Sequence, residues 1–142
     1  MHFLGCHSLF RDNQVAAVIL DYNKPSLTDR CLESLFSFNI VKTYLVENGD
    51  AGRNYFAKRY DFKFIKNSKN LGFAAGMNVG IRAAMKDGCT KIILINNDTV
   101  FLADCVELLV KALDSINQIG IAVPNRSASL KFQVCVRCSE IF

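Results

Sequence analysis

Short apolar runs alternate along the chain with longer segments in which apolar residues recur every three or four positions. An apolar run bounded by polar residues is typical of a strand that is covered on both faces. Five such runs predict strands at Val15–Leu20, Val41–Val46, Phe62–Ile65, Lys91–Ile95 and Ile119–Val123. The third run partly alternates with charge, which favours a place nearer the edge of the sheet.

Between these runs, apolar residues recur at the three- or four-residue spacing of a helix. Pro25 suits the first turn of a helix that extends to about Phe38. The loop at 67–76 leads into a second helix, which ends at Gly88, and a short polar helix is predicted at 54–59. The apolar face of the second helix is formed by Phe73, Met77, Ile81, Ala84 and Met85. A further helix is marked by Leu102, Val106, Leu109, Val110 and Leu113.

Strand and helix alternate five times with short connections, an order that favours parallel strands joined by right-handed crossovers. We therefore expect an α/β fold, a three-layer α/β/α arrangement around a mainly parallel, doubly wound sheet. Residues 15–125 form the predicted domain. An N-terminal extension at 1–14 precedes it, and a divergent tail at 126–142 follows it.

Polar residues follow four of the predicted strands directly. They are Tyr22 and Asn23, Glu47 and Asn48, the loop 67–72, and the cluster Asn96, Asn97 and Asp98. In a parallel sheet these points share one edge, so the four segments are expected to converge on one ligand-binding crevice. The alternative is a set of ordinary turn and helix-cap residues, because Asn, Asp and Thr favour both positions.

Composition narrows the class of protein. With 142 residues and 51% hydrophobic content, the chain has enough material for one globular core. The net charge of +4 is carried by scattered residues, which disfavours a nucleic-acid partner. The first ten residues do not have the pattern of a signal peptide, and no apolar run is long enough to cross a bilayer. A location in the cytoplasm or at a membrane surface is expected.

Six cysteines are present, and in a cytoplasmic protein they are expected to be reduced. Cys135 and Cys138 form a single C-x-x-C pair. A zinc site would need further ligands, which His2, Cys6 and His7 at the other end of the chain could supply. We favour a plain pair of tail cysteines over this zinc clasp.

The residues of the predicted crevice suit a nucleotide diphosphate and a divalent cation. Tyr22 could stack on a base, and Glu47 could accept a hydrogen bond from the N3–H of uracil or thymine. Gly72 and Gly76 would let the backbone approach a ligand, although turn formation and close helix packing explain such glycines equally well. Asn97 could bond the ribose. Asp98 could hold Mg²⁺ or Mn²⁺ against the diphosphate.

Four motifs together resemble the family 2 glycosyltransferases, and most closely their rhamnosyltransferase-like branch. In order they are Val-Ile-Leu-Asp-Tyr-Asn, Leu-Val-Glu-Asn-Gly, Asn-Leu-Gly-Phe-Ala-Ala-Gly-Met-Asn-Val-Gly-Ile, and Leu-Ile-Asn-Asn-Asp-Thr. They match in order and spacing from about Val15 to Asn125. The resemblance implies a GT-A fold and an inverting transfer of sugar from a UDP- or dTDP-linked donor to a glycan or lipid-linked acceptor.

Carried over by position, the resemblance places Tyr22 and Glu47 at the base, Asn97 at the ribose and Asp98 at the metal. The candidate donor-binding set is completed by Asn23, Asn48, Gly72, Asn78 and Asn96. Glu47 stands where the family more often has aspartate, and Asn96 and Asn97 leave a single acid in the D-x-D-like motif.

No catalytic residue is predicted. Inverting transfer needs a base for the acceptor hydroxyl, and after Asp114 the only carboxylate side chain is Glu140. We therefore expect a donor-binding half that lacks the acceptor half of such an enzyme, as a truncated gene product would. The alternative is a non-catalytic module that binds a nucleotide or partner. A nucleotidyltransferase or dehydrogenase is disfavoured because no glycine-rich loop follows the first strand.

Overall fold

The computed structural model describes residues 15–37, 42–49, 60–101, 105–115, 120–124 and 133–138. The strands are β1 (Val15–Asp21), β2 (Lys42–Glu47), β3 (Lys63–Lys66), β4 (Lys91–Asn96), β5 (Ile121–Ala122) and β6 (Gln133–Arg137). The helices are α1 (Pro25–Phe36), α2 (Phe73–Lys86) and α3 (Cys105–Ser115). The predicted extension at 1–14 and the predicted helix at 54–59 lie outside the described residues.

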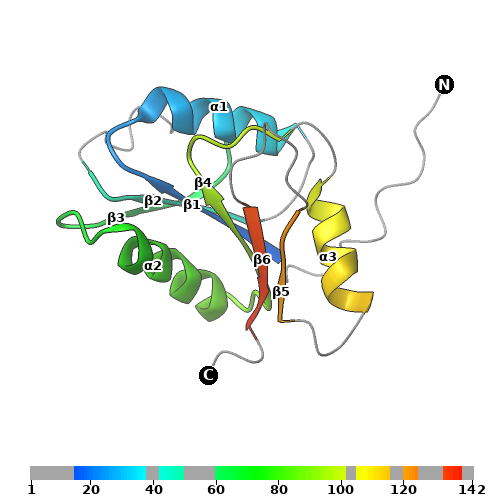
Figure 1. Cartoon of the computed structure of the whole chain (residues 1–142). Coiled ribbons are helices and arrows are strands. Elements are labelled where there is room, and N and C mark those ends of the chain that lie inside the picture. The colour runs from blue at the N-terminus through cyan, green and yellow to red at the C-terminus, as the bar shows by residue number, and fades with distance from the viewer. Residues whose placement is uncertain are drawn as a thin grey trace.

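One six-stranded sheet forms the centre of the molecule, with the order β3-β2-β1-β4-β6-β5 (Figure 1). The first four strands are parallel, whereas β6 runs antiparallel to both β4 and β5. β3 occupies one edge, as its partly alternating sequence predicts. The expected α/β fold with a mainly parallel, doubly wound sheet is therefore confirmed.

Helices cover both faces of the sheet (Figure 1). Alternate residues of β1 are buried on opposite sides: Ala17 and Ile19 pack in the same cluster as α1 and α3, whereas Ala16 and Val18 pack in the cluster that contains α2. All seven residues of β1 are buried, because a strand in the middle of such a sheet has no solvent face. None of the described helices has the length and apolar character needed to span a bilayer.

Small residues let α2 lie close against the sheet. A Cβ atom placed on Gly80 would come within 2.4 Å of Val18 Cγ1 and 2.9 Å of Val46 Cγ2. One on Gly76 would lie 2.7 Å from Leu20 Cδ1. Close packing of α2 on the sheet therefore accounts for Gly76, as one alternative left open by the sequence expects.

The carboxyl-terminal part of the chain differs most from the sequence expectation. The fifth predicted strand is reduced to two described residues, Ile121 and Ala122. β6 lies inside the predicted tail and is inserted between β4 and β5, with Ile93 paired to Cys135. A search for alternating strands and helices overlooks it, because β6 lies outside that alternation and runs antiparallel to both of its neighbours. The domain limits at 15–125 stay a prediction, but the sheet extends beyond them.

Candidate functional site

The carboxyl ends of the four parallel strands lie level with one another. Asp21 is in register with Glu47, Glu47 is in register with Lys66, and Leu20 is in register with Asn96. Each strand therefore delivers the chain to the same edge of the sheet, where open α/β folds bind ligands.

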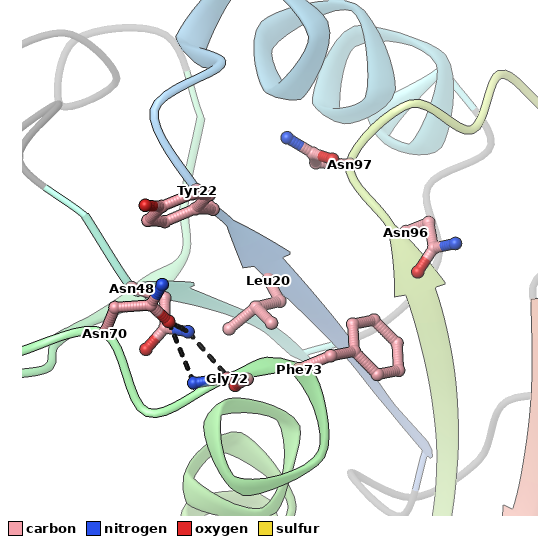
Figure 2. A pocket seen from close by; sticks show the side chains of 8 residues that line it. All are labelled: Leu20, Tyr22, Asn48, Asn70, Gly72, Phe73, Asn96 and Asn97. Atoms are coloured by element: carbon pink, nitrogen blue, oxygen red, sulfur yellow. Dashed lines mark hydrogen bonds between the residues drawn. The ribbon is translucent and has the colours of Figure 1, made fainter.

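A cavity of about 270 Å³ lies at this edge, between the end of β1 and the start of α2 (Figure 2). It is lined by Leu20, Tyr22, Asn48, Asn70, Gly72, Phe73, Asn96 and Asn97. The side chains of Tyr22 and Phe73 are exposed, at 51% and 61%, and Leu20 lies between them. No lining side chain is charged. The cavity thus offers two open aromatic rings together with neutral amide donors and acceptors.

A second cavity of about 190 Å³ adjoins the first. It is lined by Tyr22, Asn23, Asn48, Gly49, Asn67, Ser68, Lys69 and Asn70. Tyr22, Asn48 and Asn70 line both cavities, so Tyr22 stands at the boundary between an uncharged space and one that contains a lysine.

The Asn48 side chain forms hydrogen bonds to the loop 67–72, which contributes residues to the walls of both cavities. Its Oδ1 accepts hydrogen bonds from Asn67 Nδ2 at 2.9 Å and from the Leu71 backbone N–H at 3.0 Å. Its Nδ2 donates to Asn70 Oδ1 at 2.8 Å and to the Gly72 carbonyl at 3.1 Å. All four of these bonds stay within the protein, and the residue is only 2% exposed. The structure therefore gives the Asn48 side chain a supporting role in the wall.

Gly72 precedes the first turn of α2 and adopts φ 79°, a conformation that glycine tolerates best. Its N–H donates to Asn70 Oδ1 at 2.8 Å. The geometry accounts for the glycine through the turn that it makes, and it also places Gly72 in the wall of the larger cavity.

On the other side of the cavity, Asn97 is bonded to residues of β1 and α1. Its Nδ2 donates to Asp21 Oδ1 at 3.2 Å and to Thr28 Oγ1 at 3.1 Å. The Thr28 hydroxyl in turn donates to Asp21 Oδ1 at 2.5 Å. Asp21 and Thr28 are both 0% exposed, so this small network lies behind the cavity wall.

Asp98 lies on the side of the sheet that α1 covers. Burial, together with the negative charge of Asp98, raises the pKa of the Cys31 thiol on α1 from 9.0 to about 12. Asp98 is not among the residues that line either cavity, although its neighbour Asn97 lines the larger one. One of its carboxylate oxygens, Oδ1, is buried.

The structure brings six of the nine expected site residues to the two cavities. They are Tyr22, Asn23, Asn48, Gly72, Asn96 and Asn97. Three do not line them. Glu47 is fully buried at the end of β2, Asn78 is exposed on α2, and Asp98 lies toward α1.

Three residues that line the larger cavity were not among the expected site residues: Leu20, Asn70 and Phe73. Phe73 was expected on the apolar face of α2. It lies in the first turn of the helix, and its side chain is exposed instead of packed against the sheet. Its position directly after the Asn70–Gly72 loop is the sequence signal that could have identified it. Leu20 resembles any core residue of a buried strand, so no pattern sets it apart.

A divalent metal ion at this site would have few acidic side chains as ligands. Within the described ranges, no group of three His, Cys, Asp or Glu side chains is arranged to hold a metal ion. The candidate oxygen ligands are the side-chain carbonyls of Asn96 and Asn97, which line the larger cavity, and the carboxylate of Asp98, which follows them in sequence. These are hard ligands of the type that Mg²⁺ and Mn²⁺ prefer. His2, Cys6 and His7 of the alternative zinc clasp lie outside the described residues.

The fold and the cavity define a doubly wound α/β domain with a ligand site at the carboxyl edge of its parallel strands. Glycosyl transferase family 2 matches residues 17–139. The chain belongs to this family, and its match continues through β6, beyond the limit at Asn125 that the motifs indicate. No curated protein sequence matches the chain significantly.

Solved structures share the fold at low sequence identity. A protein assigned as a nucleotide-diphospho-sugar transferase from Desulfovibrio desulfuricans aligns with a TM-score of 0.62 and 14% identity, over 90% of this chain and 65% of that one. Residues 1–349 of TarS from S. aureus align with a TM-score of 0.61 and 12% identity, over 89% of this chain and 47% of that one. Rv0371c from Mycobacterium tuberculosis aligns with a TM-score of 0.57 and 13% identity, over 87% of this chain and 71% of that one.

These similarities confirm the expected GT-A type of fold. The chain spans 65% and 47% of the lengths of the first two structures that it resembles.

Proposed function

We propose that this chain binds the nucleotide diphosphate of a sugar donor in the two adjoining cavities. The observation that carries the proposal is the exposed ring of Tyr22, held between two amide-lined cavities at the carboxyl edge of the sheet. An open ring stacks on a nucleobase, and amides satisfy the hydrogen-bonding groups of a base and a ribose. Membership of the glycosyl transferase family supports a sugar attached to the diphosphate.

The charge of the cavity supports a divalent cation as part of the same proposal. A diphosphate carries at least two negative charges, and no side chain that lines the larger cavity is charged. A Mg²⁺ or Mn²⁺ ion, held by Asp98 and the neighbouring amide carbonyls, would offset that charge. The ion would supply stabilisation of the leaving diphosphate, while Tyr22 and Asn97 would orient the nucleoside.

Within this proposal the donor is UDP- or dTDP-linked, the acceptor is a glycan or a lipid-linked sugar, and the branch is the rhamnosyltransferase-like one that the four motifs favour. Inverting transfer would also require a base for the acceptor hydroxyl, which the sequence leaves unassigned. We therefore propose that this chain, studied alone, binds the donor but transfers sugar slowly or not at all.

Isothermal titration with UDP and dTDP, with and without MnCl₂, tests donor binding. We expect binding that depends on the metal, and we expect Asp98→Asn to weaken it at least about tenfold, which corresponds to about 1.4 kcal/mol. Asp61→Asn removes an exposed acid ahead of β3 and serves as the matched control. Binding that does not depend on the metal would favour the non-catalytic module, and no binding of either nucleotide would overturn the proposal. Rapid transfer by the isolated chain would contradict the slow-transfer clause.

A further inference from the structure

We propose that Asp21 is a positioning residue, which holds the Asn97 amide so that its carbonyl oxygen faces the nucleotide cavity. The inference rests on the proposed function for its meaning, because the carbonyl would accept from a ribose hydroxyl or bind the cation. Asp21 itself lines neither cavity. It would act entirely through Asn97.

Burial of the Asp21 carboxylate requires an explanation. Asp21 is the last residue of β1 and is 0% exposed, in a position where an ordinary turn residue would be expected to reach solvent. Burying a carboxylate is unfavourable unless hydrogen bonds compensate for the lost water. Asp21 Oδ1 accepts from the Thr28 hydroxyl and from Asn97 Nδ2, whereas Oδ2 is buried without a partner among the described residues. A charged group retained at this cost points to a role that an apolar residue would not fill.

The acceptor character of Asp21 fixes which end of Asn97 it contacts. A carboxylate only accepts hydrogen bonds, so the amide nitrogen of Asn97 must face it. The opposite orientation would place the Asn97 carbonyl oxygen against a carboxylate oxygen, which is repulsive. The amide nitrogen also donates to Thr28 Oγ1, so both of its bonds are directed toward β1 and α1.

The carbonyl of Asn97 is therefore the group left for the cavity that this residue lines. A neutral oxygen acceptor there complements the Asp98 carboxylate next in sequence. The pair provides two oxygen ligands while only one of them is charged. Aspartate at position 97 would instead bring two carboxylates into contact with each other, so Asp21 also explains why this position is an amide.

A double-mutant cycle tests the pair. Asp21→Asn alone removes the charge that orients Asn97, and we expect nucleotide affinity in MnCl₂ to fall about five- to tenfold with little loss in Tm. Asn97→Asp alone places a carboxylate against Asp21, and we expect Tm to fall. The exchange variant Asp21→Asn/Asn97→Asp restores one amide–carboxylate contact. We expect it to regain Tm and to bind nucleotide with a stronger dependence on Mn²⁺.

A readout that needs no ligand separates this inference from the proposed function. In ¹⁵N NMR spectra, the Asn97 side-chain NH₂ signals are expected to exchange slowly with solvent in the wild type and rapidly in Asp21→Asn and Thr28→Val. Thr28→Ser keeps the hydroxyl and serves as the matched control. If the wild type binds no nucleotide but shows this protection, the proposed function fails and the orientation of Asn97 stands. Unchanged exchange in Asp21→Asn, or strictly additive effects in the exchange variant, would overturn the inference.

Discussion

Asn67 Nδ2 donates to Asn48 Oδ1 at 2.9 Å and thereby joins the segment that follows β3 to the residue that follows β2. The backbone repeats the connection, because the Asn67 N–H donates to the Glu47 carbonyl at 2.9 Å. Two strand ends are thus fixed to each other at the place where the wall of both cavities begins.

Replacing Asn48 by aspartate tests how much this junction contributes to stability. In Asn48→Asp an oxygen takes the place of Nδ2 and faces two acceptors, Asn70 Oδ1 and the Gly72 carbonyl. Because the site is buried, we expect the free energy of unfolding to fall by about 2–4 kcal/mol. Urea unfolding measures the change. Asn78→Asp on the exposed side of α2 is the control and should stay within about 0.5 kcal/mol of the wild type.

Gly80→Ala tests the close approach of α2 to the sheet. Alanine favours the helix by about 1 kcal/mol, but its Cβ would stand 2.4 Å from Val18 Cγ1. Overpacking of a core costs about 1–3 kcal/mol, and so short a contact belongs at the upper end of that range. We expect a net loss of about 1–2 kcal/mol in thermal or urea unfolding. Arg82→Ala changes an exposed residue of the same helix, so a loss as large in that variant would contradict the packing argument.

The raised pKa of Cys31 predicts a loss of stability at alkaline pH. In the folded protein the thiol has a pKa of about 12 because of burial and the charge of Asp98, whereas the unfolded chain has a value near 9.0. Above pH 9 the unfolded state therefore releases the proton first and is favoured as pH rises. The effect reaches at most about 1.4 kcal/mol per pH unit.

Urea unfolding of the wild type and of Cys31→Ala at pH 8, 9 and 10 checks this prediction. The variant is less stable at every pH because it leaves a small cavity, but its stability should decline less steeply above pH 9. Parallel declines for the two proteins would show that Cys31 does not titrate as expected.

The two exposed rings of the larger cavity are expected to act on binding and not on stability. Tyr22→Ala should weaken UDP or dTDP binding about 5- to 150-fold, because a stacked base contributes about 1–3 kcal/mol. Tyr22→Phe keeps the ring and should bind within about threefold of the wild type. Phe73→Ala, compared with Phe73→Leu, tests the second ring. Titration calorimetry measures affinity, and Tm should change little since both side chains are exposed. Equal affinity in Tyr22→Ala and Tyr22→Phe would contradict stacking.

The apolar pattern predicted most of the fold for a simple physical reason. Strands such as β1 and β4 are covered on both faces, so nearly every residue in them is hydrophobic, and the following helices repeat at 3.6 residues. The end of α2 was also predicted from the sequence, by Gly88. In the structure Gly88 adopts φ 85°, and its N–H donates to the Met85 carbonyl at 3.0 Å. β6 was not predicted because it lies outside the alternation of strands and helices and runs antiparallel to its neighbours.

The position of a residue at the sheet edge could be predicted, but not the direction of its side chain. Tyr22 and Asn97 both follow strands and both line the cavity. Glu47 and Asp98 have the same sequence signature, yet Glu47 is buried at the end of β2 and Asp98 lies toward Cys31. Asp21 was overlooked for the opposite reason, because a polar residue at the end of a strand gave no sign that hydrogen bonds to α1 and to the residue after β4 would accompany its burial.

The insertion of β6 beside β4 sets an order of events for the growing chain. β4 can pair with β1 as soon as Lys91–Asn96 has been synthesised, but its other side stays without a strand until Gln133–Arg137 has emerged. During that interval β4 is an edge strand with bare N–H and C=O groups and four adjacent isoleucine and leucine residues, the type of surface that recruits strands from other chains. Self-association during synthesis should therefore be suppressed at the moment when β6 docks.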